Sequence, residues 1–240
     1  MFYLFFLHFS ITSLSVKNLD WKKDFSPSYT ILKIQLEPGE SIVAEPGAMV
    51  LMKGDFEIKT QAKGGLLKAI GRALVGGESI FMNTYIAKKP SEIWLSPPIP
   101  GDIEYIPMNG NEYHVQDTSY IAHHGEIEIG TKFKGFRGLL GGSGVFWLKL
   151  VGHGGVWVCG FGGINIIELD PGEEITIDNF HVVAIESTVD WKIQMIKGGL
   201  KTKIFGGEGL VIKAVGPGKI YTQSRSLGPF ASLLARFITS

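Results

Sequence analysis

The sequence lacks any excess of charge of one sign. Its 23 Lys and Arg residues balance 23 Asp and Glu residues, so the formal net charge at pH 7 is zero. A balanced chain produces no overall field that would attract nucleic acid or an anionic membrane. We therefore expect that nucleic acid is not a partner, and that any basic binding surface is local.

Cysteine is almost absent as well, since Cys159 is the only one. A single cysteine excludes an intrachain disulfide framework and fits a reducing compartment, so we expect a cytoplasmic protein. Cys159 follows the apolar residues Val156, Trp157 and Val158. We interpret it as a buried small hydrophobic residue and not as a nucleophile.

Long hydrophobic runs are also missing. Residues 1–16 are apolar and aromatic, but polar residues interrupt them and no Lys or Arg precedes them, unlike a transmembrane helix or a signal peptide. Three interpretations stay open: an extension outside the core, a start codon placed too early, and a weak export signal or membrane anchor. We assign residues 1–24 to an N-terminal extension.

Glycine is abundant, with 32 residues spread between short apolar runs and no Gly-X-Y period. Many tight turns between short apolar segments are typical of an all-β protein. The 45% apolar and 19% charged composition is that of a globular chain long enough to bury a sizeable core.

A double glycine followed by an apolar segment occurs three times, at 76–77, 141–142 and 206–207. The spacing is 65 residues in both intervals, because 141 − 76 and 206 − 141 both equal 65. A fixed period indicates a repeated structural unit. We predict one β domain over residues 25–226, built from three β-sandwich modules at about 25–96, 97–160 and 161–226.

Turn signals recur at matching places in the three modules. Glu37–Glu40 reads Glu-Pro-Gly-Glu and Asp170–Glu173 reads Asp-Pro-Gly-Glu, after alternating segments at 29–36 and 164–169. Met108–Asn111 takes this place in the middle module, with Asn-Gly at its centre. We expect the chain to turn at all three.

A carboxylate follows each turn glycine by six or seven residues, and these are Glu45, Asp117 and Asp178. If the modules surround a pseudo-threefold axis, the three carboxylates would occupy equivalent points, and if they converged they could bind a cation or share a proton. The alternative is that each caps the turn before a strand. We take them as the candidate ligand-binding residues.

No pattern typical of catalysis or of a metal site recurs in the modules. The residues after the double glycines differ between copies, the histidines lack zinc spacing, and no Ser-His-Asp order stands out. We assign no catalytic residue, no metal and no cofactor. An enzyme that uses residues of one module, such as Glu78 with Ser79 or His123 with His124, is an alternative.

Residues 227–240 differ from the repeat. Apolar residues follow three- and four-residue steps and Arg236 is the only charge, a pattern that predicts a short amphipathic helix. Three roles stay open: capping a sheet edge, packing on another subunit, and lying on a membrane surface. The candidate interaction residues lie here and in the helical pattern of 65–75: Leu66, Leu67, Ile70, Leu74, Phe230, Leu234 and Phe237.

At Glu37–Val50, Gly76–Phe81 and Gly216–Tyr221 the chain resembles the family of mitochondrial-biogenesis AIM-type proteins, over about residues 25–225. The resemblance implies a fold like that of the tryptophan RNA-binding attenuation protein: a double-stranded β-helix or β-sandwich of three modules, assembled as a homotrimer. Eukaryotic members are linked to organisation of the mitochondrial inner membrane, which implies an assembly role. This chain shows no Arg-rich transit segment, so we do not place it in mitochondria.

These observations favour a non-enzymatic oligomeric scaffold or interaction protein, with itself as partner and a protein or a membrane surface as a further one. A module that binds a small ligand or RNA, by analogy with the attenuation protein, is the first alternative. An enzyme with a pocket between modules is the second.

Overall fold

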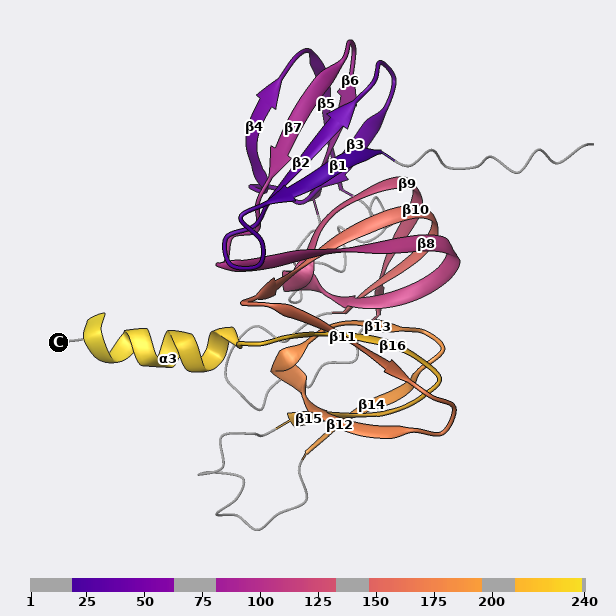
Figure 1. Cartoon of the computed structure of the whole chain (residues 1–240), viewed down its shortest axis with the longest axis vertical. Coiled ribbons are helices and arrows are strands. Elements are labelled where there is room, and N and C mark those ends of the chain that lie inside the picture. Colours follow the sequence, from indigo (N-terminus) through magenta and orange to yellow (C-terminus); the bar gives the residue numbers. More distant parts are fainter. Residues whose placement is uncertain (1–18, 63–80, 133–146, 196–209, 239–240) are drawn as a thin grey trace, which may run out of the picture.

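The structure is a computed structural model that describes residues 19–62, 81–132, 147–195 and 210–238. Within these ranges the chain forms sixteen strands, two short 3₁₀ turns and one helix. The expectation of a mostly β protein with a C-terminal helix is confirmed. Figure 1 shows three groups of strands stacked along the long axis, with the helix projecting to one side.

The first group, at the top of Figure 1, contains seven strands. They are β1 (Asp20–Asp24), β2 (Ile31–Leu36), β3 (Ser41–Ala44), β4 (Met49–Lys53), β5 (Phe56–Ala62), β6 (Phe81–Ala87) and β7 (Ser91–Leu95). Strands β1-β2-β7-β4 form a four-stranded sheet, and β3, β6 and β5 belong to the central sheet.

The middle group contains three long strands and a 3₁₀ turn: β8 (Gly101–Gln116), η1 (Asp117–Ser119), β9 (Tyr120–Lys132) and β10 (Trp147–Phe161). The third group contains β11 (Ile164–Leu169), β12 (Glu174–Asp178), η2 (Asn179–His181), β13 (Val182–Glu186), β14 (Asp190–Met195), β15 (Leu210–Val215) and β16 (Gly218–Gln223). Helix α3 (Leu227–Ile238) follows.

The middle strands join the other two groups in one nine-stranded sheet of order β11-β16-β13-β8-β10-β9-β3-β6-β5. Strand β10 pairs with β8 on one side and β9 on the other, β8 continues to β13, and β9 continues to β3. A further three-stranded sheet, β12-β15-β14, closes the lower end of the stack (Figure 1). The three groups therefore share hydrogen-bonded strands.

Strand pairing is the same in the first and third groups. Strand β7 pairs with β2 and β4 while β6 pairs with β3 and β5. In the third group β16 pairs with β11 and β13, and β15 pairs with β12 and β14. In the middle group the single strand β10 pairs with β8 on one side and with β9 on the other. Three copies around a pseudo-threefold axis stay a prediction.

Two of the three expected turns are present. Gly39 and Gly172 have φ of 87° and 82°, and the backbone N–H groups of Glu40 and Glu173 donate to the carbonyls of Glu37 and Asp170 at 2.9 and 3.0 Å. Glycine is suited to this conformation because it carries no Cβ.

The prediction of a turn at Met108–Asn111 is wrong. Strand β8 runs through it without reversing, although Gly110 has φ of 88°. The pairing with β10 passes from Glu112↔Val151 to Asn109↔His153, so two residues of β8 face one residue of β10. Such a bulge bends a strand without ending its pairing. Asn-Gly therefore serves as a kink, because β10 offers a partner along the whole length of β8.

The boundary of the N-terminal extension also needs correction. Residues 20–24, which we assigned to the extension, form β1 and pair with β2. Trp21 of β1 packs on Tyr105 and Trp157, with ring centroids 5.2 and 5.8 Å away. The charged residues around Trp21 suggested a segment outside the fold. The segment is instead a strand, and the Trp21 side chain packs on the rest of the fold.

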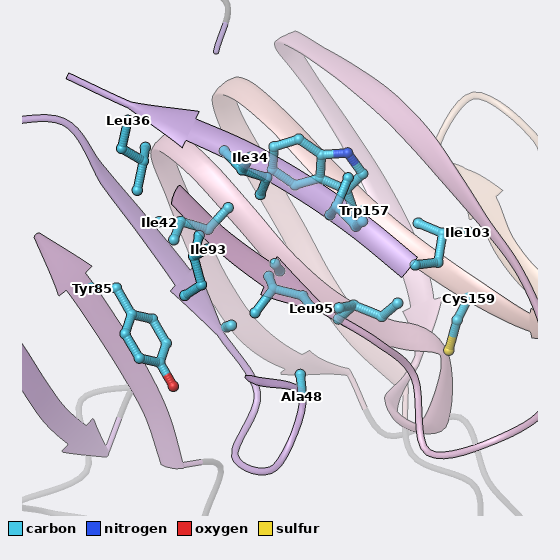
Figure 2. Packing of buried hydrophobic residues seen from close by; sticks show 14 of the residues in the cluster. Ile34, Leu36, Ile42, Ala48, Tyr85, Ile93, Leu95, Ile103, Trp157 and Cys159 are labelled. Atoms are coloured by element: carbon cyan, nitrogen blue, oxygen red, sulfur yellow. The ribbon is translucent and has the colours of Figure 1, made fainter. Parts of the chain in front are cut away.

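The hydrophobic core runs between the groups. Figure 2 shows one cluster, in which Trp157 and Cys159 of β10 pack with Ile34 and Leu95 of the first group. A second cluster joins Val43, the middle strands and Tyr221, and a third joins Trp147 to the last group. Cys159 is fully buried, as expected, and burial raises the pKa of its thiol.

Some expectations lie outside the described residues. These are the extension up to residue 18, the double glycines at 76–77, 141–142 and 206–207, and the helical pattern with Leu66, Leu67, Ile70 and Leu74. The segments after the double glycines are described from Phe81, Trp147 and Leu210 onward, where they form β6, β10 and β15, as expected.

Candidate functional site

The three predicted carboxylates lie where neighbouring groups of strands meet. The backbone N–H of Glu45 donates to the carbonyl of Ile121 at 2.8 Å, across the contact between the first and middle groups. Next to Asp117, Gln116 Nε2 donates to the carbonyl of Asn179, the residue after Asp178, at 2.8 Å. No hydrogen bond or ion pair joins the three carboxylates to one another in the described ranges, so their binding a common ligand stays a prediction.

Glu45 has the most unusual environment of the three. Burial raises the pKa of its carboxyl to about 7, and the charge of Glu45 in turn raises the pKa values of Tyr120 and Cys159, after burial itself. Tyr120 is fully buried, and its hydroxyl lies 2.6 Å from His123 Nδ1. Tyr120, His123 and Cys159 are buried, and the half-buried Glu45 acts electrostatically on Tyr120 and Cys159, near the contact between the first and middle groups.

Asp178 has a local structural role. Its Oδ1 accepts a hydrogen bond from the backbone N–H of Phe180 at 2.8 Å, which caps the 3₁₀ turn η2. Asp117 begins the corresponding turn η1. Carboxylates ahead of a strand commonly cap turns in this way.

The described residues contain no group of three or more His, Cys, Asp and Glu side chains that could hold a metal ion.

The most exposed apolar element is helix α3. None of its residues is buried, and Figure 1 shows it pointing away from the strands. Leu234 and Phe237 are 42% and 74% exposed. The helix contacts its own chain near its start, where the rings of Phe230 and Phe161 lie 5.1 Å apart. One of the three roles predicted for this helix was to cap a sheet edge of its own chain. A helix that points away from the strands does not match that role.

A second exposed apolar feature is the loop between β1 and β2. Its aromatic residues Phe25 and Tyr29 are 70% and 71% exposed. Phe25 has φ of 61°, a strained conformation for a bulky residue, and its carbonyl accepts hydrogen bonds from the N–H groups of Ser28 and Tyr29 at 3.2 Å. The loop thus holds two aromatic side chains outward.

A buried carboxylate anchors this loop. Asp102 Oδ1 accepts hydrogen bonds from Ser26 Oγ at 2.9 Å and from Thr30 Oγ1 at 2.8 Å, and lies 3.6 Å from Lys23 Nζ. Burial alone would raise the pKa of Asp102, but the hydrogen bonds and the charge of Lys23 outweigh it, and the pKa is lowered. Asp102 is therefore ionised, and it fixes the loop at Ser26 and Thr30 and lies beside Lys23 of β1.

The loop and the start of α3 lie on the same side of the molecule. The N–H of Thr30 donates to the carbonyl of Gly101 at 3.0 Å, and Gly101 pairs with Phe161, the residue that Phe230 contacts. In Figure 1 the indigo loop and the yellow helix both face left. We call Phe25, Tyr29 and the apolar residues of α3 the lateral apolar surface.

Sequence reasoning found one half of this surface. The spacing of residues 227–238 predicted the helix and its apolar residues. The sequence did not indicate that Phe25 and Tyr29 are exposed, because an aromatic residue at the end of a strand is more often buried. It did not indicate their anchor either, because Asp102 lies 76 residues from Ser26 in the chain. No local pattern reveals such a contact.

No helix in the described part of the chain has the length and apolar character to cross a bilayer.

Comparison with known proteins gives consistent results. The model of the family described as Mitochondrial biogenesis AIM24 matches residues 22–225. An uncharacterized protein of Streptococcus pyogenes serotype M6 is 32% identical over 223 residues, covering 90% of this chain and 89% of that protein. An X-ray crystal structure of a Streptococcus pyogenes protein, also 32% identical, aligns with a TM-score of 0.75 over 92% of this chain and 100% of that one.

Proposed function

The chain belongs to the Mitochondrial biogenesis AIM24 family, and we propose that it is a non-enzymatic scaffold that assembles with copies of itself, most simply as a cytoplasmic homotrimer. The single observation that carries the proposal is the lateral apolar surface. The proposal also takes up the pseudo-threefold arrangement of three modules that the 65-residue period predicts.

Helix α3 favours a protein partner on energetic grounds. Burial of a large apolar side chain contributes roughly 1.5–3 kcal/mol when complete. The exposed apolar residues of α3 are Leu227, Phe230, Leu233, Leu234, Phe237 and Ile238. Each is 40% exposed or more, so each would contribute on the order of 1 kcal/mol on docking. A contiguous surface of this kind typically marks an interaction site.

The charge pattern favours another copy over a membrane. Helices that lie in the membrane interface usually carry several Lys or Arg residues on their polar face. Helix α3 carries only Arg236, and the chain has no net charge. Attraction to anionic lipid would be weak, whereas zero net charge removes long-range repulsion between copies.

The position of α3 favours a closed ring. The helix projects from the strands (Figure 1), so it can reach a neighbouring chain, and within the lateral apolar surface the Phe25–Tyr29 loop is a patch separate from the helix. A contact between two different surfaces is heterologous and forms a ring where the rotation closes. We propose that α3 of one copy docks beside the Phe25–Tyr29 loop of the next.

Charge substitution on α3 tests this proposal. In the double variant Leu234→Lys/Phe237→Lys, two ammonium groups would have to be buried in the interface, which costs several kcal/mol. We expect analytical ultracentrifugation at micromolar concentration to show a multimer for the unchanged chain and a monomer for this variant.

A matched control comes from the opposite end of the molecule. Ile58 of β5 is 48% exposed, similar to Leu234, but lies in the first group away from α3. Ile58→Lys should keep the sedimentation of the unchanged chain. If the α3 double variant kept it too, α3 would not be the interface and the proposal would be wrong.

A further inference from the structure

The outer face of the three-stranded sheet at the lower end of the stack combines a hollow with charged side chains. Strand β15 lies between β12 and β14, and a hollow of about 340 Å³ lies on this sheet. Its lining includes Glu174, Thr176, Asp190, Lys192 and Lys213. The volume is at the small end of the range for ligand sites, about 300–1,000 Å³.

Strand register sorts the charged side chains of the hollow into two rows. Lys213 pairs with Thr176 on one side and with Lys192 on the other, which gives a basic row. Two residues along the strands, Val215 pairs with Glu174 and Asp190, which gives an acidic row. Residues two apart on a strand share one face and are about 7 Å apart, so both rows point outward.

The burial pattern agrees with this assignment. All four charged residues and Thr176 are exposed, whereas the alternate residues face the core, with Trp191 and Ala214 buried. Trp191 is held from the inner side, where its Nε1 donates to His114 Nδ1 at 3.2 Å. The hollow therefore has an apolar base, with Trp191 held in place, beneath two rows of exposed charged side chains.

The basic row leaves two like charges side by side. Residues that pair directly across antiparallel strands have Cβ atoms about 5 Å apart, and like charges in such pairs are destabilising. Within the part of the chain that the structure describes, neither Lys192 nor Lys213 has a hydrogen bond or an ion pair. An anionic group between the two ammonium groups, with the Thr176 hydroxyl as a further donor, would remove this repulsion.

The acidic row restricts which anion fits. Glu174 and Asp190 flank Val215 and would repel a polyanion such as a nucleotide, but they would accept hydrogen bonds from an ammonium group. We infer that the outer face of the β12-β15-β14 sheet binds a small zwitterion, with its phosphate or carboxylate on the Lys192–Lys213 row and its ammonium group on the Glu174–Asp190 row.

Phosphoethanolamine is a suitable probe because it places a phosphate and a primary ammonium group on a two-carbon spacer. Isothermal titration calorimetry of the full chain should show millimolar or tighter binding, at least about tenfold tighter than inorganic phosphate or ethanolamine alone, a difference of about 1.4 kcal/mol. Equal affinity for phosphate and phosphoethanolamine would overturn the inference, and so would binding of neither together with no binding to vesicles that contain phosphatidylethanolamine.

Two double variants test the contributions of the basic row and the acidic row to binding one at a time. Lys192→Gln/Lys213→Gln should weaken phosphoethanolamine binding at least about tenfold. Glu174→Gln/Asp190→Asn should remove the preference for phosphoethanolamine over phosphate by strengthening phosphate binding. All four positions are exposed, so folding should persist, and a thermal unfolding curve like that of the unchanged chain confirms it. Lys53→Gln, on exposed β4 in the first group, is the control and should bind as the unchanged chain does.

A free metabolite and a lipid headgroup share this chemistry, and vesicles distinguish them. Binding of soluble phosphoethanolamine supports a free ligand. Binding only to vesicles of phosphatidylcholine that contain phosphatidylethanolamine, lost in Lys192→Gln/Lys213→Gln, supports a headgroup. Binding that survives the loss of both lysines overturns the site.

Discussion

Glu45 shows how one residue can matter to the stability of the contact between two groups of strands. Its backbone N–H links it to Ile121, while its carboxyl lies near the buried hydroxyl of Tyr120 and the buried thiol of Cys159. Burial disfavours the charged form of a carboxyl that has no cation beside it, and this raises its pKa to about 7. The sequence predicted Glu45 as a candidate but could not show this environment, because Tyr120 and Cys159 come from the middle group.

The raised pKa predicts how stability depends on pH. The carboxyl holds its proton more tightly in the folded chain, with a pKa near 7, than in the unfolded chain, where its usual value is 4.5. The contribution of Glu45 to stability is therefore fully present below about pH 4.5 and is lost as the pH rises through about 7.

The substitution Glu45→Gln should remove this loss of folding stability at high pH. We expect the free energy of unfolding at pH 8, measured by urea titration, to rise by about 1–2 kcal/mol, less than the full shift implies because part of the carboxyl is accessible to solvent. At pH 4 the variant and the unchanged chain should agree. A gain that is equal at both pH values would contradict the assigned cause.

At the scale of the element, the long strands of the middle group depend on close approaches of the backbone. Gly152 of β10 has φ of 142°, and a Cβ there would lie 2.0 Å from the carbonyl oxygen of Glu126 on β9. This position lies opposite the bulge at Gly110, so the two glycines let β8 and β10 bend together.

Gly152→Ala should therefore destabilise the fold, by at least about 2 kcal/mol, through both backbone strain and overlap with β9. Gly163→Ala is the matched control, since a Cβ at Gly163 has open space around it. Thermal unfolding followed by circular dichroism measures both. Equal thermal unfolding midpoints for the two variants would show that the close approach of β9 to Gly152 does not contribute to stability.

The elements differ in how well local sequence predicted them. Pro-Gly at Glu37–Glu40 and Asp170–Glu173 predicted real turns because each contains its own hydrogen bond. The same reasoning failed at Asn109-Gly110, where pairing with β10 outweighs the local preference. It also missed β1, whose register with β2 and whose Trp21 contacts are long-range. The period of α3 was sufficient because a helix depends on neighbours three and four residues away.

At the scale of the whole molecule, the 65-residue period predicted three repeated modules, which stay a prediction, and it did not show how the groups join. The identical pairing of the first and third groups fits the period, while the fused strands β8, β9 and β10 connect them through one sheet. Long-range pairing of this kind depends on burial between groups, which a one-dimensional pattern does not contain. The lateral apolar surface likewise combines residues from both ends of the chain.

The mass of the full chain in solution tests the central claim most directly. One copy has a mass of 26.3 kDa, so a trimer has three times that, about 79 kDa. Size-exclusion chromatography with light scattering at micromolar concentration should give this mass, and the Leu234→Lys/Phe237→Lys variant should give 26.3 kDa. A full chain that elutes with the mass of one copy would contradict the proposal that this protein assembles with itself.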